Sequence, residues 1–143
     1  MTKTSKEYTY KELLDLVAKF AGVLKNHGVE KGDRIIIYMP MIPEAIVAIL
    51  ACTRVGATHS IVFGGFGGPE LASRILDAKP KVIVCASCGI EPHKIVDYKV
   101  LCDEAIKIAN VQGLHKIVVN RETLKVELKE GEDFEFYSEM EKA

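Results

Sequence analysis

The sequence lacks the features that would direct it to a charged polymer or to a membrane. Its 19 lysines and arginines stand against 20 aspartates and glutamates, and the net charge of −1 gives no general attraction to nucleic acid or anionic lipid. Its apolar runs are too short to span a bilayer, and Met1–Glu7 lacks the apolar core of a secretory signal. We expect no nucleic-acid or membrane partner and a soluble protein, cytoplasmic or, in a eukaryote, in the mitochondrial matrix.

Cysteine is also scarce, with four residues in a chain of 143. Three of the four lie in apolar surroundings, which favours buried, reduced thiols and a reducing compartment. Cys85 and Cys88 form a CxxC pattern, but Gly89 and Pro92 follow where a thioredoxin-type pair would open a helix. A structural zinc site would need two further ligands at suitable spacing. A redox or zinc protein is therefore the weakest of the alternatives, and no metal ligands are assigned.

The residues that are present predict alternating helices and strands. Thr9 and Glu12 form a capping box at the start of an amphipathic helix, which Gly28 ends. The run Arg34–Tyr38 is continuously apolar after its first residue, as expected of a strand covered on both faces. The next expected elements are a helix at Pro43–Val55, a strand at His59–Val62, a helix at Pro69–Ala78, a strand at Lys81–Cys85, a helix capped by Asp97 and a strand at His115–Val119.

This alternation indicates the α/β class. We expect one domain over residues 1–143, with a mainly parallel sheet and helices on both faces. Within the helix at Pro43–Val55, the stretch Ala45–Val55 is apolar on nearly every side, so this helix should be buried. Residues 123–143 form an acidic, less regular tail, in which four apolar residues could support short strands: Val126, Leu128, Phe134 and Phe136.

Isolated charged residues carry no assigned chemistry. The acidic side chains of the tail are expected to form a solvated face or loop: Glu127, Glu130, Glu132, Asp133 and Glu135. The four histidines are scattered, and none stands beside a carboxylate partner or a nucleophile in the sequence: His27, His59, His93 and His115. We expect them to be structural, and the helix dipole alone explains a histidine at position 27.

The glycine-rich segment at residues 63–68 is the strongest candidate for a binding site. A strand, a glycine-rich turn and a helix N-terminus together present backbone N–H groups and a positive dipole end to an anion. The spacing fits neither standard fingerprint, because Glu70 stands where the dinucleotide motif needs glycine and no Gly-Lys-Ser/Thr follows. Glycines that only permit a tight turn remain the alternative explanation.

Several segments resemble the adenylate-forming superfamily of acyl-CoA synthetases, luciferases and peptide-synthetase adenylation domains. Residues 28–34 (GVEKGDR) resemble a strand entry of that superfamily. A more specific set resembles the acetyl-CoA and propionyl-CoA synthetases: residues 38–45 (YMPMIPEA), 50–52 (LAC), 59–60 (HS) and 63–66 (FGGF). Residues 88–92 (CGIEP) are closer to the propionyl type, since typical acetyl-CoA synthetases carry arginine where Glu91 stands.

The resemblance implies an AMP-forming ligase. ATP, assisted by Mg²⁺, and a short carboxylic acid would give an acyl-adenylate and pyrophosphate, and the thiol of CoA would then displace AMP. In relatives, residues that border the CoA nucleotide correspond to Phe63, Gly64, Gly65 and Lys94. Glu91 introduces a negative charge near a phosphate, which Lys94 would have to offset.

Other parts of the family pattern do not occur in this sequence. It has no Ser/Thr-Gly-rich phosphate loop ending in Pro-Lys-Gly, no adenine and ribose motifs, no acyl pocket and no late catalytic lysine. We therefore expect an internal piece of the synthetase that is inactive alone. Its apolar segments at Arg34–Tyr38 and Ala45–Val55 would be partly bare and favour self-association. The alternative is a non-catalytic α/β module that binds a nucleotide or a partner protein.

Overall fold

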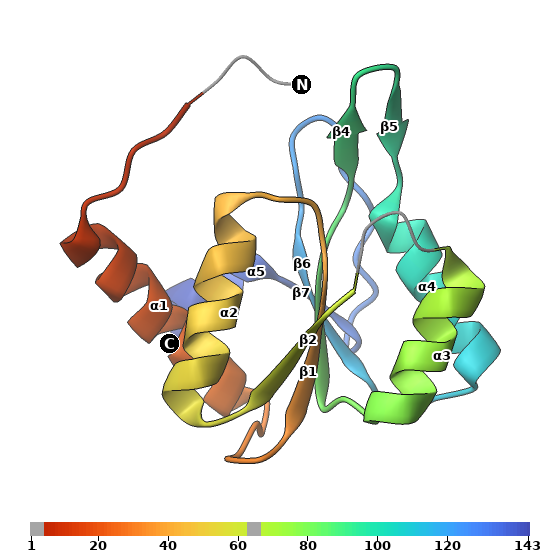
Figure 1. The fold of residues 1–143 in the computed structure, drawn as a ribbon, viewed down its shortest axis with the longest axis horizontal. Helices are drawn as coiled ribbons and strands as arrows, with labels where there is room; N and C mark the ends of the chain where they lie inside the picture. The colour runs from red at the N-terminus through yellow and green to blue at the C-terminus, as the bar shows by residue number, and fades with distance from the viewer. Residues whose placement is uncertain (1–4, 63–66) are drawn as a thin grey trace.

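The fold was analysed in a computed structural model that describes residues 5–62 and 67–143. Helices and strands alternate over most of the chain (Figure 1). In chain order the elements are α1 (Tyr10–Asn26), β1 (Arg34–Tyr38), α2 (Pro43–Val55), β2 (Thr58–Ile61), α3 (Gly68–Ala78), β3 (Val82–Ala86), β4 (Gly89–Glu91), β5 (Lys94–Val96), α4 (Tyr98–Ala109), β6 (His115–Val119), β7 (Asp133–Glu135) and α5 (Phe136–Lys142).

Five strands form one sheet in the order β2-β1-β3-β6-β7, and every pairing within it is parallel. The remaining two strands, β4 and β5, pair with each other as an antiparallel hairpin. The hairpin directly follows β3 and extends beyond the ends of the parallel strands (Figure 1). The parallel α/β sheet predicted from the sequence is confirmed.

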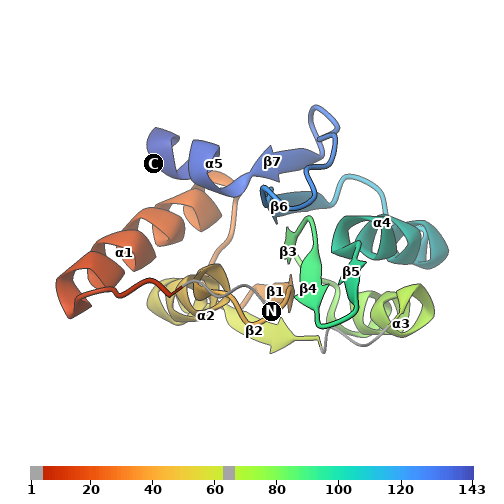
Figure 2. The same cartoon turned by 90° about the horizontal axis from the view of Figure 1, so that it is seen from above.

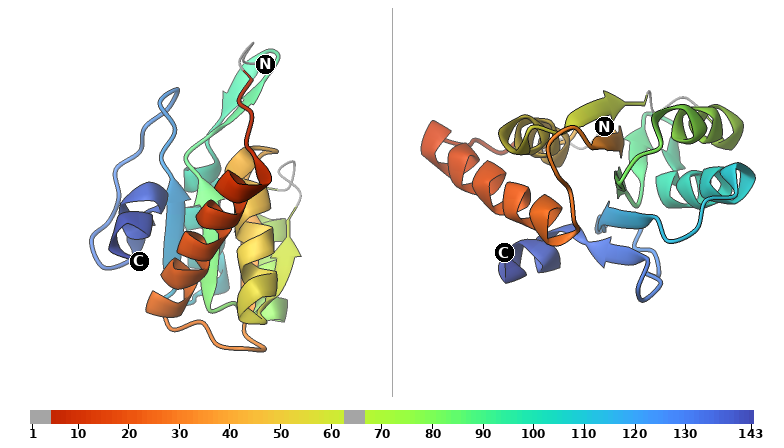
Figure 3. Two further views of the ribbon diagram at one scale, coloured as in Figure 1. Left: turned by 90° about the vertical axis from the view of Figure 1, so that its left-hand side faces the viewer. Right: turned by 90° about the horizontal axis from the view of Figure 1, so that it is seen from below.

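Helices cover both faces of the sheet, as Figures 2 and 3 show from several sides. Because side chains alternate along a strand, Ile35 and Ile37 of β1 enter the core beneath α1, α2 and α5. Ile36 and Tyr38 enter the second core beneath α3 and α4. All four are at most 1% exposed. The surface expected to be bare at Arg34–Tyr38 is therefore covered by this chain's own helices, except at Arg34.

Local capping signals set the ends of the helices where the sequence predicted them. The Thr9 hydroxyl accepts a hydrogen bond from the Glu12 N–H at 3.1 Å, and Asp97 accepts one from Val100 N–H at 3.0 Å. Gly56 ends α2 with a φ of +76°, in the left-handed region that glycine enters without a steric penalty. These contacts join residues close in sequence, which is why the sequence alone reveals them.

Burial of α2 is incomplete, as expected of an apolar segment at Ala45–Val55 that is partly bare in this chain. Ile46 is 48% exposed and Leu50 40% exposed, although Ala48 and Ala51 on the same helix are completely buried. The helix lies in an outer layer against the sheet, with α1 at one side (Figure 2), so one of its flanks has no covering element among the described residues. Among those residues, no helix has the length and apolar character needed to cross a membrane.

The expected irregular tail contains an additional helix. Of the four apolar residues expected to support strands, only Phe134 lies in one, the short strand β7. Phe136 opens α5, which the Glu135 carboxylate caps by accepting from Ser138 N–H at 2.7 Å. The ring of Phe136 stacks on Phe20 of α1 with centroids 4.5 Å apart. This buried aromatic pair attaches the tail to the domain.

Candidate functional site

The predicted site residues belong to the carboxyl edge of the sheet, where the parallel strands end. Lys94 opens β5 of the hairpin at this edge, and its side chain is 67% exposed. Phe63, Gly64 and Gly65 lie outside the described residues. Description resumes at Gly67, the N-cap of α3, which supplies no side-chain capping bond. Ligands of open parallel sheets bind at this kind of edge.

Lys94 does not stand alone on the hairpin. It is the cross-strand partner of Glu91, and its Nζ lies 3.7 Å from the Glu91 Oε2. Both side chains are at least half exposed, so the attraction between them is strongly screened by water. The Lys94 ammonium can therefore leave Glu91 for a phosphate at little cost, but the carboxylate stays nearby and weakens the field that the phosphate meets.

Two tyrosine rings support the base of the hairpin. Tyr38, at the end of β1, meets Tyr98, at the start of α4, edge to face with centroids 5.1 Å apart. Burial and the neighbouring Tyr98 raise the pKa of Tyr38 to about 12, so its hydroxyl stays protonated. Gly89 opens β4 against Tyr98, and a Cβ at position 89 would overlap that ring. A glycine is thus required where the hairpin passes over the aromatic pair.

A second close approach fixes the start of α3 against α4. A Cβ at Gly68 would lie 2.8 Å from the Glu104 carboxyl carbon, closer than real side chains approach. The first turn of α3 therefore packs directly on α4, which begins at the same edge (Figure 1). Gly68, at the end of the glycine-rich segment, thus contributes close helix packing.

Arg121 is a cation at this edge that the sequence analysis missed. Its backbone N–H donates to the Ser87 hydroxyl at 2.8 Å, and its guanidinium donates to the Cys88 carbonyl at 3.2 Å. These bonds join the segment after β6 to the base of the hairpin. The sequence did hold a signal for Arg121, which comes two residues after the predicted strand at His115–Val119. Because the carboxyl ends of parallel strands share one edge, that position places Arg121 at the edge of the candidate site.

The CxxC residues are packed in the interior. Cys85 and Cys88 are both completely buried, and all four cysteines are free thiols. Cys85 hydrogen-bonds with Cys102 of α4, and this bond, together with burial, raises the pKa of the Cys85 thiol. The expectation of buried thiols is confirmed, and Cys85 has Cys102 as its partner across the second core.

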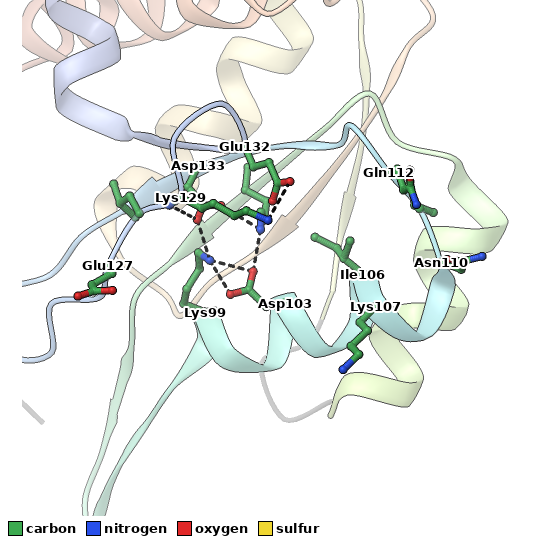
Figure 4. Close-up of a pocket in the computed structure, with 13 residues that line it drawn as sticks. Lys99, Asp103, Ile106, Lys107, Asn110, Gln112, Glu127, Lys129, Glu132 and Asp133 are labelled. Carbon is green, nitrogen blue, oxygen red and sulfur yellow. Dashed lines mark hydrogen bonds and ion pairs between the residues drawn. The ribbon is translucent and has the colours of Figure 1, made fainter.

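A pocket of about 620 Å³ lies beside α4, β7 and the segment between β6 and β7 (Figure 4). Lys99 Nζ lies 2.6 Å from Asp103 Oδ2 and 3.0 Å from Asp133 Oδ2. Lys116 Nζ lies 2.7 Å from Asp103 Oδ1 and 2.9 Å from Asp133 Oδ1. Figure 4 shows Lys99 and Asp103 of α4 directed toward Asp133 of β7. Two positive and two negative groups thus alternate around one ring.

This ionic ring corrects the expectation of a solvated face for Asp133, whereas Glu127 and Glu130 are exposed as expected. Asp133 is buried, with only 1% of its side chain exposed. Burial alone would raise its pKa, but the Lys129 N–H and the two ammonium groups outweigh burial and lower it. Because the two buried lysines are already neutralised, the ring leaves no net charge for a substrate. We interpret the ring as a structural contact that holds β7 against α4.

The histidines also differ from the expectation. His27 Nε2 lies 2.6 Å from Glu139 Oε1 of α5, and His27 Nδ1 lies 3.0 Å from Nδ1 of His115. The helix dipole alone is therefore a wrong explanation for His27, because a carboxylate 112 residues later in the chain contacts it. Both partners were invisible in the sequence because the fold, and not the spacing, brings them together.

Both a family model and individual relatives match nearly the whole chain. The family model described as AMP-binding enzyme matches residues 1–142. The chain is 49% identical over 144 residues to the human acyl-CoA synthetase short-chain family member 3, mitochondrial, covering 100% of this chain and 21% of that protein. It is 44% identical over 141 residues to the acetyl-coenzyme A synthetase of Bartonella quintana, covering 96% of this chain and 22% of that protein.

A third relative is more similar over a shorter stretch. The acyl-CoA synthetase short-chain family member B, mitochondrial, of Dictyostelium discoideum is 54% identical over 124 residues, covering 87% of this chain and 18% of that protein. The chain thus spans about a fifth of the length of the curated relatives that it matches.

Proposed function

Since this chain belongs to the AMP-binding enzyme family, we propose that it forms part of a ligase that activates acetate or propionate with ATP and transfers the acyl group to CoA. Support comes from the names of the relatives, which are short-chain acyl-CoA and acetyl-CoA synthetases. These relatives match over nearly the whole chain. The proposal concerns the complete ligase, of which the chain would supply one portion.

In the proposed reaction, a carboxylate oxygen of the acid attacks the α-phosphorus of ATP, and pyrophosphate leaves. The thiolate of CoA then attacks the acyl carbon, and AMP leaves with the electron pair of the carbon–oxygen bond. Mg²⁺ would neutralise charge on the phosphates during the first step. No residue of this chain is proposed to hold Mg²⁺ or to act on the reacting atoms.

The portion proposed for this chain is the border of the CoA nucleotide, formed by Phe63, Gly64, Gly65 and Lys94. The observation that carries it is the exposed Lys94 ammonium on a hairpin at the carboxyl edge, with only a screened partner in Glu91. A mobile phosphate can compete for such a cation. Glu91 limits the strength of this contact, so the affinity of the isolated chain for CoA should be weak.

Replacement of Lys94 by alanine tests this assignment. Calorimetric titration with CoA should show weaker binding for Lys94→Ala and a smaller loss of affinity with added salt, because one phosphate contact is removed. Lys19→Ala is the matched control, since Lys19 is also exposed but lies on α1. Equal CoA affinity and equal salt dependence in Lys94→Ala and the unchanged chain would refute the role of Lys94.

A further inference from the structure

A second polar pocket lies at the opposite edge of the sheet, where the parallel strands begin. Its volume is about 440 Å³, and its polar side chains are His27, Lys81, Gln112 and His115. Lys81 immediately precedes β3 and His115 opens β6. No carboxylate is among the described residues that line it. Apart from the neutral amide of Gln112, its polar side chains are therefore cationic or become cationic on protonation.

Lys81 brings an uncompensated positive charge to this pocket. Its side chain folds over Gly28, so that a Cβ at position 28 would lie 3.5 Å from Lys81 Cε and 3.9 Å from Nζ. No ion pair to Lys81 occurs among the described residues. Its field also reaches His115, whose pKa is lowered by burial, by His27 and by Lys81, against an opposing effect of the Glu139 carboxylate.

The hydrogen bonds of His27 and His115 determine which ring nitrogen of each carries the proton. An ionised carboxylate can only accept, so His27 carries its proton on Nε2 and donates it to Glu139, which also pairs with Lys142. A neutral His27 then has a bare Nδ1, which accepts from the Nδ1–H of His115. In neutral His115 the remaining nitrogen, Nε2, carries no proton. It also has no hydrogen-bond partner among the described residues.

We propose that this pocket binds a small tetrahedral oxyanion, of the phosphate or sulfate type, between the Lys81 ammonium and Nε2 of His115. Binding takes up one proton, which adds to His115 Nε2 and turns it from an acceptor into a charged donor. The bond from His115 Nδ1–H to His27 is unchanged by that step. Burial and the Lys81 charge otherwise disfavour protonation of His115, and the negative charge of the anion offsets both effects.

Nuclear magnetic resonance of the histidine ring protons in the full chain tests the proposal. Sulfate is the probe, because it keeps its double charge across the titration range of histidine, about pH 5 to 8. Sodium sulfate should shift the His115 resonance saturably and raise its pKa, and binding should be tighter at the acid end of that range. Sodium chloride at the same ionic strength should do neither.

Lys81→Ala should weaken sulfate binding roughly tenfold, as loss of a hydrogen bond to a charged group implies. Lys81→Arg should restore most of the affinity, and Lys19→Ala should leave it unchanged. Both Lys81 and Lys19 have exposed side chains, so the variants should fold, which unchanged resonances elsewhere would verify. An equal response of His115 to sulfate and chloride, or an unaltered sulfate affinity in Lys81→Ala, would overturn the proposal.

Discussion

His27 donates a hydrogen bond of 2.6 Å to Glu139, and this contact joins the end of α1 to α5. The same histidine accepts from His115 at the start of β6, so one imidazole links three elements. The link depends on protonation, because Nδ1 of His27 and Nδ1 of His115 share a single proton. If both imidazoles were charged, two donors would face each other and the bond would be lost.

The first prediction is a loss of stability in mild acid. The pKa of His115 in the folded chain is below its ordinary value of 6.5, so the unfolded chain binds more protons and stability falls as the pH decreases through 6.5. The folded pKa of Glu139 is also lowered, from an ordinary 4.5, and adds a second loss below that pH. Urea denaturation midpoints measured across this range should decrease in these two steps.

Variants separate the two steps. His115→Asn should abolish the first step, because it removes the histidine whose pKa is lowered in the folded chain. It should retain the second step, because Glu139 is still present. His93→Asn is the control, since His93 is exposed in the hairpin, and it should leave both steps in place. A first step of full size in His115→Asn would contradict the assignment to His115.

The second prediction concerns the ionic ring of Lys99, Asp103, Lys116 and Asp133. Asp133→Asn leaves two buried ammonium groups with only the half-exposed Asp103 as a charged partner. Loss of one partner of a buried pair should reduce the free energy of unfolding by roughly 3 kcal/mol. Glu130→Gln removes an exposed carboxylate of the same segment and should change it by less than about 0.5 kcal/mol. Equal effects of the two variants on urea denaturation would show that the ring contributes nothing.

The sequence predicted those elements whose signals are local. Thr9, Gly56 and Asp97 act on backbone groups within three or four residues, so their patterns were readable without a fold. The β1 boundaries were likewise predicted correctly, because a continuously apolar, β-branched run that starts after Arg34 describes a buried parallel strand. The alternation of helices and strands along the chain likewise predicted a parallel sheet with helices on both faces.

The missed features depend on distant partners. The hairpin at 89–96 is held over Tyr98 and Tyr38, and α5 is held by Phe20. In the sequence, Gly89 and Pro92 argued only against a helix after the CxxC pair, and the acidic run before Phe136 concealed a helix. Asp133 resembled its solvated neighbours, and nothing nearby in the sequence marked it as the partner of Lys99 and Lys116.

The third prediction is that the chain alone catalyses no adenylation. The sequence has no phosphate loop of the family type and no late catalytic lysine, so we expect no group that would hold the ATP phosphates beside a reacting acid and offset the charge that develops on them. A pyrophosphate-coupled assay with acetate and with propionate should remain at background. Turnover that requires the acid would contradict this prediction.

The fourth prediction is self-association through the edge strand β2. Sheet order leaves β2 paired on one side only, and Ile61 at its end is 56% exposed. Such an edge can pair with another copy, and the exposed Leu50 and Ile46 of α2 add apolar surface. Light scattering should show a mass that increases with concentration.

Lysine substitutions locate this contact. Ile61→Lys should shift the chain toward the monomer, because a charge opposes pairing at a strand edge. Val100→Lys changes a side chain of similar exposure, 57%, on α4, and should leave the association unchanged. A mass that stays monomeric at every concentration in the unchanged chain would show that neither surface drives association.

The central claim is that this chain supplies the CoA-facing border of a ligase and not its ATP site. Calorimetric titration of the Lys81→Ala chain, in which the oxyanion pocket is weakened, with CoA and separately with ATP tests it most directly. We predict weak, salt-sensitive binding of CoA through Lys94 and weaker or undetectable binding of ATP. Binding of ATP more tightly than CoA would contradict the account.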